Sequence, residues 1–184
     1  MAQTASNMIP LGTLAPNFKL PDTISGKVFS YGDLRGEKGT LVIFMCNHCP
    51  FVLHVIDEIV RIGQVCQAQQ IGIVAISSND VIKYPQDSPE LMKAFAAKHQ
   101  MDFPYLYDQS QEVAQAYDAA CTPDFFLFDK QNKLFYRGQL DDSRPSNGIP
   151  VSGYDLRQAI DLMLQGKEPP EIQKPSIGCN IKWK

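Results

Sequence analysis

The sequence lacks several features that mark common classes of protein. It has no run of Lys or Arg, and its formal net charge is -3, so a surface that follows nucleic-acid phosphates is not expected. No apolar segment reaches the roughly 18 residues that span a bilayer. Residues 1–10 also lack the basic and apolar regions of a signal peptide. These absences predict a cytoplasmic protein with neither a nucleic-acid nor a membrane partner.

Cysteine is scarce, at five residues among 184, and the number is odd. A framework of structural disulfides normally uses an even number, and in a reducing compartment closely spaced cysteines are more often redox centres or metal ligands. A zinc site needs about four ligands, whereas the chain has one CxxC motif and no second CxxC or CxxH. The sequence therefore favours redox chemistry, and we expect neither a metal nor an organic cofactor.

The order of apolar segments predicts an α/β fold with a mixed central sheet flanked by helices. Near-continuous apolar runs at 40–45 and 71–76 are typical of strands covered on both faces. Between them, apolar residues recur at helical spacing from about residue 50 to residue 66. This alternation predicts parallel neighbouring strands. The aromatic segments 125–128 and 134–136, which flank a turn, predict an antiparallel hairpin.

Local signals predict where further elements begin. Ser88 and Pro89 are typical of an N-cap and a first helical residue, and the helix they open would turn Leu91, Ala94 and Phe95 inward. Ser152, with an acid three residues later, is expected to cap the last helix. We expect a single domain over residues 1–184, with an N-terminal β-hairpin extension at 10–32 and an extended C-terminal tail at 167–184.

The CxxC motif lies where its chemistry would be strongest. Cys46 directly follows a predicted central strand, and Cys49 precedes the predicted helix. A helix N-terminus stabilises an anion, so this position would lower the pKa of Cys46 and make it nucleophilic. Cys49 is close enough in sequence to close a small disulfide and to resolve a mixed disulfide formed at Cys46. The motif thus predicts thiol–disulfide exchange.

Several segments together resemble the thioredoxin-like redoxin superfamily, in its alkyl-hydroperoxide-reductase and peroxiredoxin-like branch. The segment 12–20 (Gly-x-x-Ala-Pro-x-Phe-x-Leu) resembles its N-terminal signature, and 44–50 (Phe-Met-Cys-Asn-His-Cys-Pro) resembles its active-site segment. The segment 121–129 resembles the thioredoxin segment that carries a cis-proline before a strand. The tail segments 136–145 and 175–184 resemble uncharacterised peroxiredoxin-like members. The likeness covers almost the whole chain.

The resemblance implies a thioredoxin fold, a cis-Pro123, and a Thr122 backbone that pairs with a bound partner chain. Its departures are informative. In the peroxiredoxin motif, Cys46 occupies the place of the threonine, and the arginine that polarises peroxide falls near Pro123. These two departures favour Cys46 as a thioredoxin-type nucleophile. The buried carboxylate of thioredoxins corresponds to Thr40, so another base or water must accept the proton from Cys49.

The other candidate residues keep two interpretations each. His48 is either a group that favours the Cys46 thiolate or an exposed loop residue. Cys121 is a further redox thiol or a small buried filler, and Cys179 is an extra resolving thiol or a structural residue. Cys66 falls on the inward stripe of its helix, which favours packing.

The partners we expect are protein dithiols or disulfides, or low-molecular-weight thiols, and the sequence sets no oligomeric state. Two rival functions stay open. The first is a thiol peroxidase that reduces hydroperoxides. The second is a non-enzymatic module that binds a metal or a partner through Cys46, Cys49 and Cys179.

Overall fold

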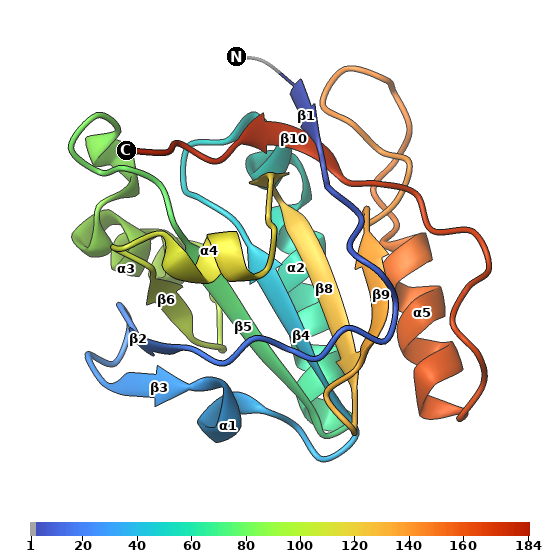
Figure 1. The fold of residues 1–184 in the computed structure, drawn as a ribbon. Helices are drawn as coiled ribbons and strands as arrows, with labels where there is room; N and C mark the ends of the chain where they lie inside the picture. The colour runs from blue at the N-terminus through green and yellow to red at the C-terminus, as the bar shows by residue number, and fades with distance from the viewer. Residues whose placement is uncertain (1–2) are drawn as a thin grey trace.

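A five-stranded mixed sheet forms the centre of the protein in this computed structural model, which describes residues 3–184 (Figure 1). Its strands lie in the order β6-β5-β4-β8-β9. β4, β5 and β6 are parallel, whereas β8 is antiparallel to β4 and β9 to β8, which confirms the predicted mixed sheet. The bounds are β4 Gly39–Phe44, β5 Ile71–Ser77, β6 Tyr105–Tyr107, β8 Asp124–Asp129 and β9 Leu134–Gly138.

Three helices cover one face of this sheet: α2 (Pro50–Ala68), α3 (Pro89–Lys98) and α5 (Tyr154–Leu164). The apolar stripe predicted for α2 is buried against Leu41 and Ile43 of β4. It consists of Val52, Val55, Ile56, Ile59, Ile62 and Cys66. None of the helices within residues 3–184 has the length and apolar character needed to cross a bilayer.

The opposite face is covered by the N-terminal hairpin and two short helices. The hairpin consists of β2 (Lys19–Pro21) and β3 (Val28–Ser30), as predicted, and α1 (Tyr31–Leu34) and α4 (Glu112–Ala116) lie beside it. Val42 and Phe44 of β4 point to this side, so successive residues of β4 serve opposite layers. The continuous apolar run of β4 follows from this burial on both faces.

Helix α3 begins as predicted but faces a different way. Ser88 caps it by accepting the backbone N–H of Leu91. Leu91 and Ala94 are exposed, whereas Met92 and Ala96 join Phe95 in the core, so the predicted inward face was wrong by part of a turn. The observed stripe has i, i+3, i+4 spacing, which is an equally regular amphipathic pattern.

The cap of α5 comes from far along the chain. The left-handed residue Gly153 is the N-cap, instead of the predicted Ser152. The carboxylate of Asp141 accepts the backbone N–H groups of Ser152 and Gly153, both at 2.7 Å. A side chain at Gly153 would also meet Glu58, with its Cβ 2.6 Å from Oε1.

The tail is extended, as predicted, but part of it belongs to a second sheet. Ile177–Asn180 forms β10, which lies between β1 (Gln3–Ala5) and β7 (Cys121–Thr122) and is antiparallel to both. Figure 1 shows β10 crossing above the end of the central sheet, beside β1. Segments from both ends of the described chain therefore meet at the edge from which α2 starts.

Candidate functional site: a buried dithiol

The two cysteines of the CxxC motif lie between β4 and α2. Cys46 follows the end of β4, and Cys49 is the N-cap residue of α2. Cys46 is 1% exposed and Cys49 is fully buried. All five cysteines of the chain are thiols in this structure. A partner must therefore approach sulfur atoms that the surrounding segments almost completely cover.

The segment around the predicted cis-proline faces the dithiol. The Thr122–Pro123 peptide bond is cis, as the resemblance implied. The Thr122 hydroxyl lies 3.6 Å from the Cys46 sulfur, and the Cys49 thiol donates to the Thr122 carbonyl at 3.2 Å. The structure thus brings together four residues that the sequence predicted from two distant segments: Cys46, Cys49, Thr122 and Pro123.

A hydrogen bond between the two thiols governs their ionisation. It lowers the pKa of Cys49 from 9.0 to about 5 and raises the pKa of Cys46, which burial and the charge of Asp87 raise further. The start of α2 adjoins Cys49 rather than Cys46, so the expected lowering of the Cys46 pKa was wrong. Because the two thiols are coupled, the negative charge left when one proton is lost belongs to the pair.

His48 is held beside Cys46 by a buried carboxylate. Its Nδ1 lies 2.7 Å from Asp87 Oδ2 and 4.0 Å from the Cys46 sulfur, and its ring stacks on Tyr84. Asp87 is fully buried and also accepts the backbone N–H of Asn47 and the side-chain amide of Asn79. His48 is thus an oriented neighbour of the dithiol, held by Tyr84 and by Asp87 of the short 3-10 helix Pro85–Asp87.

The same cluster contains three potential metal ligands. One ligand atom each from Cys46, His48 and Asp87 lies within 4.8 Å of the other two. However, both oxygen atoms of Asp87 already accept hydrogen bonds, and Nδ1 of His48 faces one of them. The groups satisfy one another as a carboxylate–imidazole pair beside a thiol, and a metal would have to displace these bonds.

Replacing His48 by alanine is expected to make the dithiol less oxidising, by about 30 mV or less. The imidazole favours the Cys46 thiolate when protonated, and its loss leaves the Asp87 carboxylate uncompensated near that sulfur. A glutathione redox titration measures the potential. His54→Ala is the control, since His54 bonds to Ser143 instead. An equal shift in both variants would refute a specific role for His48.

The remaining cysteines differ in whether their sulfur contacts the dithiol. Cys66 and Cys121 are fully buried, and burial raises the pKa of both thiols, that of Cys66 to about 12. The Cys121 thiol faces the carbonyls of Pro123 and Ser176 rather than the dithiol. By contrast, the Cys179 thiol shares a hydrogen bond with Cys49. Of these three cysteines, Cys179 is the one whose sulfur contacts the pair.

The strand edge at Thr122 differs from the expectation. We expected the Thr122 backbone to pair with a bound partner chain, but it is paired with Cys179 of β10. The approach is close, because a Cβ at Gly178 would lie 1.9 Å from the Thr122 carbonyl oxygen. The chain's own tail therefore occupies the edge beside the cis-proline.

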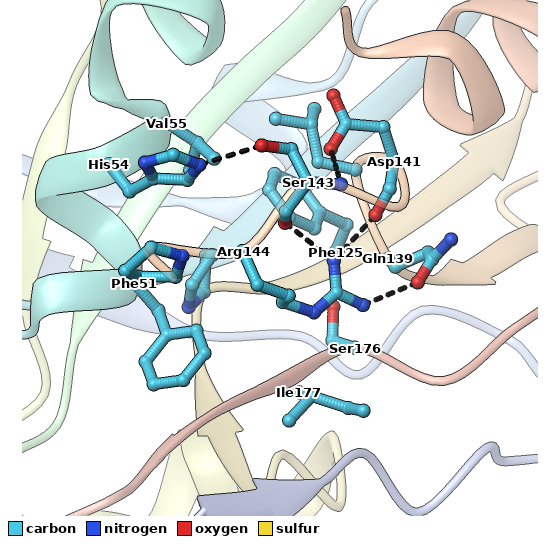
Figure 2. A pocket seen from close by; sticks show the side chains of 13 residues that line it. Phe51, His54, Val55, Phe125, Gln139, Asp141, Ser143, Arg144, Ser176 and Ile177 are labelled. Carbon is cyan, nitrogen blue, oxygen red and sulfur yellow. Dashed lines mark hydrogen bonds between the residues drawn. The ribbon is translucent and has the colours of Figure 1, made fainter. Parts of the chain in front are cut away.

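A charged loop flanks the site and is held together by its own side chains (Figure 2). The Arg144 guanidinium donates to the carbonyls of Asp141 and Ser143 and to the side chain of Gln139. The hydroxyl of Ser143 lies 2.7 Å from His54 Nε2 on α2. The cavity beside the loop has a volume of about 20 Å³, with Phe51 and Pro123 in its wall, and is large enough for one water molecule.

Two buried carboxylates near the site were missed at the sequence level. Asp87 precedes the Ser88 cap and was hidden by that stronger local signal. Asp124 directly follows the cis-proline, and burial raises its pKa well above its ordinary range. No local pattern predicts either contact, since the partners of Asp87 lie in the CxxC loop and after β5.

A thiol pair between a central strand and a helix, opposite a cis-proline in a sheet of this order, defines a thioredoxin-fold redoxin. The chain belongs to the AhpC/TSA family, whose model matches residues 11–137. It is 28% identical, over 135 residues, to the thiol-disulfide oxidoreductase ResA of Geobacillus thermodenitrificans, covering 71% of this chain and 70% of the relative.

Two solved structures show how far the fold is shared. An uncharacterized conserved protein from Geobacillus kaustophilus is 55% identical, with a TM-score of 0.98, and the match covers 100% of this chain and 97% of that one. The thioredoxin domain of a thiol-disulfide oxidoreductase from Bacteroides vulgatus is 18% identical, with a TM-score of 0.62, covering 73% and 91%. The second likeness shows the thioredoxin fold alone.

Proposed function

We propose that this protein is a thiol–disulfide oxidoreductase in which Cys46 attacks a partner disulfide and Cys49 resolves the resulting mixed disulfide. The observation that carries the proposal is the buried thiol pair packed against Thr122, with the Cys46 sulfur 3.6 Å from its hydroxyl and the Cys49 thiol donating to its carbonyl at 3.2 Å. The names of the ResA relatives support the same class of reaction. The partners we propose are protein thiols and disulfides or low-molecular-weight thiols, and the cytoplasmic location stays a prediction.

The assignment of Cys46 as the attacking sulfur depends on access as well as charge. When the pair loses the Cys46 proton, Cys49 keeps its own proton on the Thr122 carbonyl, and the Thr122 hydroxyl can donate to the Cys46 thiolate. Cys46 also adjoins His48, whose side chain is 16% exposed, whereas Cys49 is enclosed by Thr122 and Cys179. A partner disulfide would therefore reach Cys46 first.

The exchange then follows in two balanced steps. The Cys46 thiolate attacks one sulfur of the partner disulfide, forms a mixed disulfide and releases the other partner sulfur as a thiolate. Cys49 then attacks Cys46, which releases the second partner sulfur and leaves a Cys46–Cys49 disulfide. The partner gains two electrons that the dithiol loses, and a reducing dithiol reverses the sequence.

Trapping the intermediate tests this order. Cys49→Ser is expected to accumulate a mixed disulfide with oxidised glutathione at Cys46, because the resolving thiol is gone. Mass spectrometry of the tryptic peptide 39–61, which holds both motif positions, detects the adduct. Cys66→Ser is the matched control, since it removes a buried thiol from α2 but leaves the pair intact. Equal adduct levels in the two variants would contradict the proposal.

A thiol peroxidase is the second candidate, and the low pKa of Cys49 favours it. Aligned with the peroxiredoxin motif, Cys49 takes the position of the peroxide-reactive cysteine, and a pKa of about 5 makes it a thiolate at neutral pH. Stopped-flow oxidation by hydrogen peroxide separates the two functions. A peroxidase acting through Cys49 would be oxidised rapidly as the wild type and slowly as Cys49→Ser, whereas an oxidoreductase led by Cys46 is expected to consume peroxide slowly in both forms.

A further inference from the structure

The C-terminal strand brings a third sulfur to the dithiol. β10 is antiparallel to β7, and Cys179 lies opposite Thr122 in this register. Thr122 also accepts the Cys49 thiol through its carbonyl oxygen, at 3.2 Å. Cys49 and Cys179 therefore adjoin the same residue, and their thiols share a hydrogen bond. Cys49 thus contacts a sulfur on each side, Cys46 within the motif and Cys179 from the tail.

The tail strand is built into this position. Cys179 is only 2% exposed, and on its other side it is paired with Gln3 of β1. Gly178 permits the close approach, because any side chain there would overlap the Thr122 carbonyl. Cys179 is thus fixed by backbone pairing on both sides rather than carried on a loose end.

We propose that Cys179 is a third redox-active thiol, which exchanges with the Cys46–Cys49 disulfide to form a Cys49–Cys179 disulfide. This inference rests on the proposed function, which supplies the first disulfide. The Cys179 sulfur attacks the Cys49 sulfur, the Cys49–Cys179 bond forms, and the Cys46–Cys49 bond breaks. The electron pair of the broken bond leaves on Cys46, so exchange involves no net oxidation or reduction.

The exchange also balances in protons. Burial raises the pKa of Cys179 to about 12, so its thiol gives up a proton only when a base is at hand. The one proton that Cys179 loses is matched by the one that the departing Cys46 thiolate gains. The result is a dithiol in which the attacking cysteine is reduced again while the oxidising equivalent is held on Cys49 and Cys179.

Neighbouring cysteines do not fit this role. Cys121 lies on the same strand pair, opposite Asn180, but its thiol faces the carbonyls of Pro123 and Ser176. Cys66 is buried on the inner face of α2. Cys121→Ser is therefore a matched control, because it removes a buried sulfur next to Thr122 whose hydrogen bonds go to the Pro123 and Ser176 carbonyls.

Disulfide mapping of the full chain tests the proposal. Tryptic peptide 39–61 holds Cys46 and Cys49, peptide 168–182 holds Cys179, and Cys121 falls in 99–130. The protein is equilibrated across a series of glutathione ratios, quenched in acid, blocked with a maleimide and digested. Wild type and Cys121→Ser are expected to yield a disulfide-linked pair of peptides 39–61 and 168–182. Cys179→Ser is expected to lose that pair while still forming the Cys46–Cys49 disulfide.

The variants of the motif assign the link and separate the two proposals. Cys46→Ser is expected to retain the linked peptides through Cys49, and Cys49→Ser is expected to lose them. The inference is overturned if all of Cys179 is labelled by the maleimide, and is therefore a free thiol, at every glutathione ratio while peptide 39–61 forms its internal disulfide. If peptide 39–61 forms no internal disulfide yet Cys46→Ser still links Cys49 to Cys179, the proposed function fails instead. If neither disulfide forms, both fail.

Discussion

Asp87→Ala is expected to destabilise the protein by about 2–4 kcal/mol, because it leaves buried hydrogen-bond donors without an acceptor. Asp87 is fully buried, and its carboxylate accepts the backbone N–H of Asn47 at 2.9 Å and the side-chain amide of Asn79 at 2.8 Å. It also holds Nδ1 of His48 at 2.7 Å. Removing this acceptor would loosen the CxxC segment, because Asn47 and His48 of that segment both bond to it.

Urea unfolding measures the loss, through a lower midpoint at an unchanged slope. Asp57→Ala is the control, because the Asp57 side chain is 80% exposed and its removal should change stability by no more than about 0.5 kcal/mol. Asp87→Asn isolates the charge: it should lower the pKa of Cys46, which the carboxylate raises. An Asp87→Ala variant as stable as the Asp57 control would refute the anchoring role of this residue.

Gly178→Ala is expected to displace β10 from the cis-proline segment, at a cost of about 1–3 kcal/mol from overpacking. The added Cβ would lie 1.9 Å from the Thr122 carbonyl oxygen and 2.7 Å from its carbon, and both are backbone atoms that cannot rotate away. Displacement would uncover Cys49 and Cys179, which are 0% and 2% exposed when β10 is in place. Their rates of alkylation by iodoacetamide should therefore rise.

Gly32→Ala is the matched control for this substitution. Gly32 lies in α1, and an added Cβ would be no closer than 3.7 Å to its nearest neighbour, the Ser30 hydroxyl. It should leave stability and thiol alkylation close to wild type. If Gly178→Ala also alkylates at the wild-type rate, β10 does not shield the site in solution, whatever the effect on stability.

The sequence allowed accurate prediction of features that depend on local spacing. The buried stripe of α2, the Ser88 cap and the strands of the central sheet follow from periodicity and capping chemistry, which involve residues a few positions apart. Helix α3 shows the limit, because Leu91 and Met92 are adjacent apolar residues and only packing decides which is buried.

The parts of the site that escaped prediction depend on distant contacts. Asp87 reaches Asn47 and Asn79 across loops that periodicity does not describe, and Asp141 replaces the local cap predicted for α5. The resemblance predicted the cis-proline correctly. The pairing of Thr122 with Cys179 could not be predicted, because it depends on where the tail runs in the folded protein. Register between strands so far apart is fixed by the finished fold alone.

The position of β10 has a consequence for a chain that is still being made. The cysteines of the motif precede β10 by most of the sequence, and they emerge from the ribosome long before Cys179 is added. At a synthesis rate of about 5–20 residues per second, that interval is on the order of 10 seconds. During this interval β10 does not yet cover the dithiol, so cellular thiols can react with Cys46 and Cys49 before Cys179 can. The first oxidation state of each molecule would then be set by the thiol–disulfide balance of the compartment in which it is synthesised.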